Sequence, residues 1–286
     1  MSLRAYLRGI YYALKNQVIA LDYPWHAHSR YSQSQSINPV LDQWCASGSD
    51  TYRDWLNRFT AYLPFYQSIP LETGNPLRSF YWRNGYFPGL DLVGLYALVR
   101  EIKPGQILEI GSGNSTAVMR QAILDGGLNT KIRCIDPHPR RDIITVADEI
   151  LSKSLESLRN LDIFDSLVPG DILFFDGSHI ALPNSDVTVF FLEILPRVPP
   201  GVYIQIHDIY LPFDYPTDMV QRGYNEQYLL ALALLTAPAS FEPVFPAWWI
   251  SRQSAFRQLL DQQIWDHLQE KGIEKHGGSF WFKKTG

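Results

Sequence analysis

From residue 91 onwards, short apolar segments alternate with segments in which apolar residues recur at helical spacing. Such alternation is typical of parallel strands covered by helices on both faces, joined by right-handed crossovers. Two later strands, separated by a helix at about 252–271, allow one strand to be antiparallel. We therefore expect an α/β fold, a doubly wound Rossmann-like sheet of seven mostly parallel strands. The expected strands lie at 106–111, 131–136, 148–153, 171–177, 199–209, 241–250 and 277–284.

The first 89 residues differ in composition, being rich in Tyr, Trp, Gln, Ser and Pro and without a repeated strand pattern. Helical spacing of apolar residues occurs at about 3–20 and 51–63, whereas 23–50 has the composition of an irregular loop. We interpret residues 1–89 as a helical and irregular N-terminal cap, and residues 90–286 as the main domain.

Charge and cysteine content limit the classes of partner. The chain has 286 residues and a formal net charge of -4, which argues against a nucleic-acid partner. No apolar stretch reaches the roughly 18 residues typical of a membrane span. Only Cys45 and Cys134 are present, without CxxC spacing, which fits a reducing cytoplasm better than a disulfide framework. We expect a cytoplasmic protein with a small-molecule partner, and both a monomer and a homodimer remain open.

The segment Glu109–Thr116, with sequence EIGSGNST, follows an expected strand and opens an expected helix. Its two glycines let the backbone approach a ligand closely, and the helix N-terminus suits a negatively charged group. Asp136 ends the next strand, where a carboxylate can accept hydrogen bonds from both ribose hydroxyls. This pattern predicts a nucleoside cofactor bound by Glu109, Gly111, Ser112, Gly113, Asn114, Ser115, Thr116, Asp136 and Pro137.

The same segment argues against a dinucleotide. Thr116 stands where a dinucleotide-binding loop prefers a third glycine, and Glu109 precedes the first glycine by two residues. The E-x-G-x-G pattern, with an acid ending the second strand, resembles the class I S-adenosylmethionine-dependent methyltransferases. The Pro-Pro-Gly entry to the fifth strand is similar too, and the resemblance covers about residues 91–284.

This resemblance implies roles for individual residues. The glycine loop would contact the methionine part of S-adenosylmethionine, and Asp136 would contact its ribose. Glu156, just after the weak third strand, would lie near the adenine, although a solvated helical position explains Glu156 equally well.

Two neighbouring strands end in ionisable residues. The fourth ends in Asp176-Gly177-Ser178-His179 and the fifth in His207-Asp208, at the sheet edge where α/β proteins bind ligands. The arrangement resembles the metal-dependent O-methyltransferases of the catechol and macrolide-sugar type. That resemblance implies that Asp176 and Asp208 hold Mg²⁺ and that His179 is the general base. Hard cations prefer such oxygen ligands, and imidazole suits proton transfer near neutral pH.

The sequence departs from the catechol type at the residue after the strand-five acid, where an amide is replaced by Ile209. A third ligand would have to be His207 or Asp186. Adjacent strand residues point to opposite faces, so His207 is not expected to share an ion with the acid that follows it. Imidazole would also suit manganese or iron better than magnesium. Asp186 fits the first turn of a helix. Metal dependence stays open, and without a metal Asp176 would face the cofactor amine or the acceptor.

Aromatic and polar residues flank the fifth strand and are expected to rim the acceptor pocket. They are Tyr210, Phe213, Tyr215, Asn225 and Trp82. We therefore predict an S-adenosylmethionine-dependent methyltransferase that modifies a hydroxyl of a small molecule or sugar. The alternatives are an oxidoreductase or hydroxylase on a methyltransferase-like scaffold, and a non-catalytic cofactor-binding module.

Overall fold

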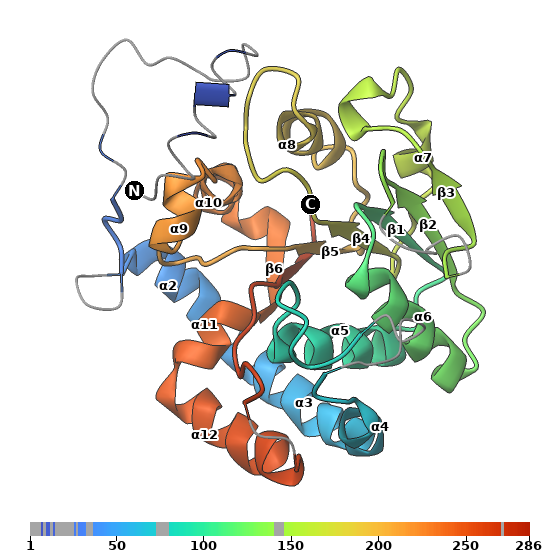
Figure 1. Ribbon diagram of the computed structural model, residues 1–286, viewed down its shortest axis with the longest axis vertical. Coiled ribbons are helices and arrows are strands. Elements are labelled where there is room, and N and C mark those ends of the chain that lie inside the picture. The colour runs from blue at the N-terminus through green and yellow to red at the C-terminus, as the bar shows by residue number, and fades with distance from the viewer. Residues whose placement is uncertain are drawn as a thin grey trace.

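A computed structural model of the chain has the α/β architecture that the sequence predicts (Figure 1). It describes residues 7, 10, 11, 14, 26, 28–32, 37–72, 80–139, 146–269 and 272–286. The helix expected at about 3–20 therefore lies mostly outside the described residues. Within those described residues, no helix is both long and apolar enough to cross a membrane.

A single seven-stranded sheet organises the molecule, in the order β3-β2-β1-β4-β5-β7-β6. Strands β1 to β5 are parallel, and β7 is antiparallel to both β5 and β6. All four residues of β4 are buried, as expected for a strand covered on both faces. The predicted doubly wound, mostly parallel sheet is confirmed. The strands are β1 Gln106–Ile110, β2 Lys131–Ile135, β3 Glu149–Leu151, β4 Ile172–Phe175, β5 Tyr203–Ile206, β6 Phe241–Pro246 and β7 Phe280–Lys284.

Helices cover both faces of the sheet. Figure 1 shows α5 and α6 with α3 and α4 on one face, and α8 and α10 on the other. The described helices are α2 Pro39–Ala46, α3 Ser49–Phe59, α4 Leu63–Ser68, α5 Gly89–Ile102, α6 Asn114–Gly126, α7 Asp162–Asp165, α8 Asp186–Val189, α9 Thr217–Gln221, α10 Glu226–Thr236, α11 Ala247–Arg252 and α12 Ser254–Gln263.

Residues 39–46, before α5, form a helix that their composition does not suggest. Residues 23–50 were expected to be an irregular loop, but α2 forms within them. The Asn38 side chain begins this helix by accepting hydrogen bonds from the backbone N–H groups of Val40 and Leu41, each at 3.2 Å. Proline in the first turn also favours this helix start. The prediction of a loop was wrong for this segment because a capping residue outweighed the polar composition.

Helix α3 shares its core with the sheet. Tyr52, Leu56 and Phe59 lie on one face of the helix and are fully buried. The Phe59 ring lies 5.4 Å from the ring of Phe245 in β6. Helix α3 and strand β6 thus contribute to one continuous core. The boundary between a cap and a main domain at residue 89 stays a prediction.

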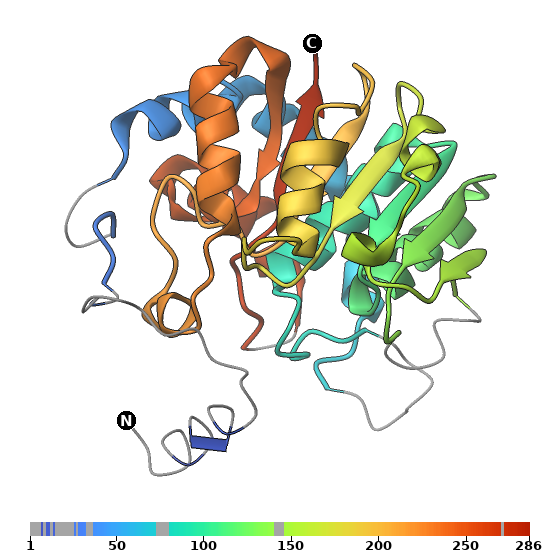
Figure 2. The ribbon, with the colours of Figure 1, turned by 90° about the horizontal axis from the view of Figure 1, so that it is seen from above.

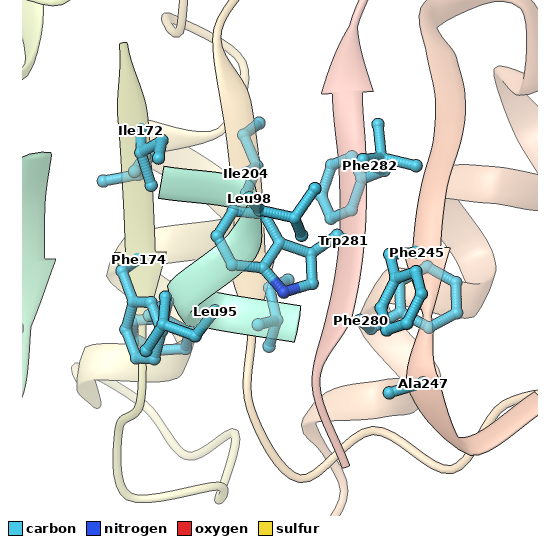
Figure 3. Close-up of a cluster of buried hydrophobic side chains, with 14 of the residues drawn as sticks. Leu95, Leu98, Ile172, Phe174, Ile204, Phe245, Ala247, Phe280, Trp281 and Phe282 are labelled. Carbon is cyan, nitrogen blue, oxygen red and sulfur yellow. The ribbon is translucent and has the colours of Figure 1, made fainter. Parts of the chain in front are cut away.

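The C-terminal elements complete that core beside β7. The strand expected at 241–250 ends at Pro246, and residues 247–250 belong to α11. The helix expected at about 252–271 is shorter and forms α12. Figure 3 shows large side chains that lie together here, among them Leu95 of α5, Phe245 of β6 and Trp281 of β7. In Figure 2, the loop before α5, the segment carrying α9 and the loop before β7 gather at one edge of the sheet.

Candidate functional site

A cavity of about 900 Å³ lies at the carboxyl ends of the parallel strands. Open α/β sheets bind ligands at this edge, where the strand order reverses beside β1. The glycine loop and the residues that follow β2, β4 and β5 form its walls. Those used below are Gly111, Ser112, Asp136, Asp176, His179, His207, Asp208, Tyr210 and Tyr224.

A second cavity of about 830 Å³ lies beside α4, α5 and α6, away from the strand ends. Its charged groups are already satisfied by neighbours. Arg100 donates to the Tyr96 hydroxyl at 2.9 Å, and that hydroxyl donates to Asp125 at 2.7 Å. Arg120 is paired with Asp148 at 2.6 Å. We therefore centre the site on the cavity at the strand ends.

The two glycines of the loop play different structural parts. Gly111 has φ of +86°, and a Cβ added there would overlap the backbone carbonyl oxygen of Asp176. Only glycine fits this position, because the ends of β1 and β4 approach each other closely. Gly113 has an extended φ, and a Cβ added there would meet no atom within 4 Å.

Glu109 lies beneath the loop instead of in the cavity. Its fully buried carboxylate accepts hydrogen bonds from the hydroxyls of Ser115 and Thr116, both at 2.6 Å, and from the Cys134 thiol at 3.3 Å. The Thr116 hydroxyl in turn accepts from the Gly113 N–H at 2.9 Å. These side chains hold the start of α6 against β1 and β2, and their direct contact with a cofactor stays a prediction.

The predicted cofactor residues fall into two groups. Gly111, Ser112, Asp136, Pro137, Glu156 and Asp176 line the cavity, whereas Glu109, Gly113, Asn114, Ser115 and Thr116 are not part of its lining. The Asp136 carboxylate accepts from the Ser112 hydroxyl at 2.5 Å and from the His138 N–H at 2.8 Å. Two loops therefore hold this carboxylate at the end of β2.

Replacing Glu109 by Gln should change how stability depends on pH. Burial raises the pKa of Glu109 to about 7, against the opposing effect of the Ser115, Thr116 and Cys134 hydrogen bonds. When the pKa of a carboxyl is higher in the folded than in the unfolded protein, its contribution to the free energy of unfolding is greatest below about pH 4.3. That contribution is lost as the pH rises to about 7. Across this window Glu109→Gln should therefore gain up to about 3 kcal/mol relative to the native protein.

Thermal unfolding of both proteins between pH 4.5 and 8 measures this difference. Altered hydrogen bonds shift the whole curve of the variant by a constant amount, so only the slope is diagnostic. Parallel curves would show that Glu109 ionises in the folded protein as easily as in the unfolded chain.

The ionisable residues predicted at the strand ends come together in space. Nε2 of His179 lies 3.6 Å from Oδ1 of Asp176 and 3.6 Å from Oδ2 of Asp208. Nδ1 of His207 lies 3.5 Å from Oδ1 of Asp208 and 3.9 Å from Oδ1 of Asp176. Two carboxylates and two imidazoles thus face one another in one cavity.

The expectation that His207 and Asp208 point to opposite faces was wrong. Strand β5 ends at Ile206, so the alternation of a strand does not apply to the two residues that follow. Asp208 has φ of +56°, a left-handed conformation that turns its carboxylate towards the imidazole beside it. His179 also has a positive φ, of 64°. Non-glycine residues in this region are uncommon and gather at functional sites.

Sequence reasoning missed two buried acids that support the imidazoles. Oε1 of Glu226, at the start of α10, lies 2.5 Å from Nδ1 of His179. Oδ2 of Asp91, in the first turn of α5, lies 3.3 Å from Nε2 of His207. Acids in a first turn normally interact with the helix dipole, which hides their role. The sequence signal was that each of these acids opens a strongly apolar helix.

The acids raise the proton affinity of both imidazoles. Burial alone would lower the pKa of His179, but Glu226, followed by Asp176 and Asp208, raises it to about 9. Burial likewise opposes protonation of His207, and Asp91 and Asp208 lead the groups that raise its pKa to about 10. The surrounding carboxylates therefore favour the protonated, positively charged form of both histidines.

The three-ligand metal site that included His207 is not formed. Within the part of the chain that the structure describes, no three His, Cys, Asp or Glu side chains are grouped to hold a metal ion. Asp186 instead accepts hydrogen bonds from the N–H and hydroxyl of Ser178, at 2.6 and 2.5 Å. The carboxylates of Asp176 and Asp208 still fit Mg²⁺, because this ion keeps several waters and often takes only one or two protein carboxylates.

The predicted acceptor residues are only partly in place. Tyr210 lines the cavity. Trp82 is 1% exposed and packs against Trp265, so it belongs to the core instead of the rim. Three other predicted residues also lie outside the cavity lining. The lining instead includes Tyr86, Met219 and Tyr224, which were not predicted. Tyr215 is buried, Phe213 accepts a hydrogen bond from Gln227 at 3.1 Å, and Asn225 accepts from the Ala181 N–H at 2.6 Å instead of capping α10.

Comparison with known proteins finds a similarity over part of the chain. Residues 108–209 match a family model described as a methyltransferase domain. No curated protein matches the chain. Similar solved structures include CmcI-N160 with S-adenosylhomocysteine (SAH), at 14% identity over 78% of this chain and 92% of that one, with a TM-score of 0.40.

Two others are SAH-bound PaMTH1 from Podospora anserina (13% identity, 100% and 97% coverage, TM-score 0.40) and MycE from the mycinamycin pathway. MycE, in complex with Mg, SAH and mycinamycin VI, aligns at 18% identity over 65% of this chain and 47% of that one, with a TM-score of 0.36. Such low TM-scores carry no weight on their own. The family model bears out the resemblance to methyltransferases inferred from the glycine loop, and from β1 to the end of β5 this chain is similar to methyltransferase domains.

Proposed function

We propose that this protein is an S-adenosylmethionine-dependent methyltransferase that modifies a hydroxyl group of a small molecule. The observation that carries the proposal is the single cavity that joins the glycine loop and Asp136 to the cluster of His179, Asp176 and Asp208. The methyltransferase-domain match over residues 108–209 supports it. The cofactor and the acceptor would thus meet at the carboxyl edge of the sheet.

The residues at the cofactor end of the cavity fit the proposed ligand. Gly111 lines this end of the cavity, and its φ of +86° and close contact with the Asp176 carbonyl oxygen set the path of the loop there. The Asp136 carboxylate is held by Ser112 and a backbone N–H at the end of β2, the position suited to ribose hydroxyls. Glu156 lines the same end of the cavity and would lie beside the base.

At the other end, His179 would accept the proton of the acceptor hydroxyl at Nε2. When bound, S-adenosylmethionine supplies an electrophilic methyl group: the acceptor oxygen bonds to its carbon, and the carbon–sulfur bond breaks with the electron pair remaining on sulfur. His179 must be neutral to act. The positive charges of bound S-adenosylmethionine and Mg²⁺ would lower the pKa of its imidazole. The protein otherwise contributes by positioning, because the reaction is an in-line displacement.

Asp176 and Asp208 would hold a hydrated Mg²⁺ beside the acceptor. The ion would lower the pKa of the acceptor hydroxyl. The rings of Tyr210 and Tyr224 line the same part of the cavity and suit a sugar or phenol ring.

Calorimetric titration of metal-stripped protein with S-adenosylmethionine, SAH and NAD, each with and without Mg²⁺, tests the proposal. We expect the two adenosyl ligands to bind, NAD not to bind, and Mg²⁺ to change the binding heat. Binding of NAD alone would favour a dinucleotide-dependent oxidoreductase, and binding without any methyl transfer would favour a non-catalytic module.

Replacing Asp136 by Ala should weaken S-adenosylmethionine binding about 10- to 100-fold. Hydrogen bonds to a charged group contribute about 1.5–3 kcal/mol, and the variant removes those to the ribose. Titration of the variant measures the loss. Asp148→Ala is the matched control, since Asp148 lies near β2 and β3 but outside the cavity. Equal affinity of the Asp136 variant and the native protein would place the ribose elsewhere.

A further inference from the structure

The start of α10 contacts His179 through three consecutive residues, the two that precede the helix and Glu226, its first residue. The backbone N–H groups of Asn225 and Glu226 donate to the His179 carbonyl oxygen, at 3.0 and 3.3 Å. The ring of Tyr224 stacks on the imidazole at 4.5 Å between centroids and 27° between planes. This segment therefore fixes both the unusual backbone conformation of His179 and the plane of its ring.

The Glu226 side chain adds a contact of a different kind. Its carboxylate is 0% exposed, and Oε1 lies 2.5 Å from Nδ1 of His179. Oε2 is buried without a hydrogen-bond partner among the described residues. A buried carboxylate is costly unless it is paired, so the imidazole is the group that makes this position tenable.

The pairing determines which ring nitrogen carries the proton. Burial raises the pKa of Glu226 to about 7, and above that pH the ionised carboxylate only accepts hydrogen bonds, so Nδ1 of His179 is the donor to it. In the neutral ring, Nε2 then has the free lone pair. Nε2 is also the atom that faces the cavity, 3.6 Å from both Asp176 and Asp208.

The position of Glu226 separates it from the other acids of the cluster. Asp176 and Asp208 lie on the cavity side of the ring, with side chains 42% and 22% exposed. Glu226 lies on the opposite side of the ring, is fully buried and is not part of the cavity lining. It can affect the reaction only through His179.

We propose that Glu226 is a positioning residue that holds the proton on Nδ1 of His179 and directs the free Nε2 at the acceptor hydroxyl. This inference rests on the proposed function. As the acceptor proton moves to Nε2, the ring becomes an imidazolium with one proton on each nitrogen, and Glu226 stabilises its charge. The proton on Nε2 then leaves to water, which restores the starting tautomer.

Two substitutions separate orientation from packing. Glu226→Gln keeps the shape, but its amide N–H₂ can donate to Nδ1, which favours the tautomer with the proton on Nε2. Glu226→Asp keeps the carboxylate at the cost of one methylene. We expect the Gln variant to lower kcat about 10- to 10³-fold, with KM for S-adenosylmethionine changed less than about threefold. The Asp variant should retain more turnover than the Gln variant.

The experiment combines kinetics with histidine spectroscopy. Methyl transfer from S-adenosylmethionine to catechol is measured for the native protein, both Glu226 variants, His179→Ala and the double variant His179→Ala/Glu226→Gln. Nitrogen-15 NMR of the histidine rings is recorded on the SAH-bound proteins. The His179 signals are assigned by their absence from the His179→Ala spectrum, and thermal unfolding verifies that each variant is folded.

The expected result is an exchange-protected Nδ1 proton on His179 in the native and Asp proteins that is lost in the Gln protein. The double variant should be no slower than His179→Ala alone. A Nδ1 proton that persists in the Gln variant, equal loss of turnover in the Asp and Gln variants, or a further loss in the double variant would overturn the role of Glu226. Full turnover of His179→Ala would instead overturn the assignment of the base. The ring spectrum needs no acceptor, so the two failures are distinguishable.

Discussion

Replacing His179 by Ala is expected to lower methyl transfer about 10²–10⁴-fold, the usual contribution of a positioned general base. The imidazole is the titratable group whose Nε2 faces both strand-end carboxylates in the cavity, at 3.6 Å from each. Affinity for S-adenosylmethionine should change by less than about threefold, because the loss falls on a step that follows binding. Transfer of a radiolabelled methyl group to phenol and sugar hydroxyls, together with calorimetric titration, measures both quantities.

The control for this variant is His267→Ala, which removes an imidazole at the protein surface near the end of α12. It should leave turnover and affinity at native values. A His179 variant that binds the cofactor and still turns over at the native rate would show that another group, or water, takes the proton.

Replacing Gly111 by Ala should weaken S-adenosylmethionine binding more than about 100-fold. The backbone of Gly111 has φ of +86°, which costs an alanine about 1–3 kcal/mol. The added Cβ would also meet the carbonyl oxygen of Asp176, so the end of β1 or of β4 must move. Either movement displaces the glycine loop or the acid that lines the cavity. Calorimetric titration measures the affinity, and thermal unfolding measures the loss of stability.

Gly113→Ala is the matched control two residues further along the same loop. Its Cβ would have open space, so no neighbouring strand has to move, and the losses of affinity and unfolding temperature should be smaller than for Gly111→Ala. Equal behaviour of the two alanine variants would mean that the loop is free to rearrange, and that the close approach of β1 and β4 is not required for binding.

The sheet was predictable because its evidence is local. Segments such as residues 106–111 and 171–177 are short and apolar, and turn residues bound them, so burial on both faces dictates their strand conformation. The glycine loop and Asp136 were predictable for the same reason, since a left-handed turn and a strand-end acid are visible in one stretch of sequence. Short-range chemistry also accounts for Asp186, which lies in the first turn of α8 as expected, directly after the capping residue Ser185.

Aromatic residues were predicted less well. Trp82 and Tyr210 have the same chemistry in the sequence, yet Trp82 packs against Trp265 while Tyr210 lines the cavity. An aromatic ring stabilises a core and a ligand pocket by the same burial of apolar surface, so composition does not distinguish the two. The segment around α2 was missed for a related reason, because its polar residues concealed a helix that depends on one asparagine cap.

The amino-acid sequence alone shows which functional groups follow each strand. These are a glycine loop after β1, an acid after β2, and acids with histidines after β4 and β5. Tertiary structure alone decided how these groups act on one another. Glu226 follows His179 by 47 positions, yet the packing of α10 brings its carboxylate to 2.5 Å from the ring. Asp91 reaches His207 from another helix, and the left-handed turn at Asp208 brings its carboxylate back to the same cavity. Such contacts depend on the distance and orientation between separate helices and strands. The periodicity of apolar residues along the sequence predicts neither quantity.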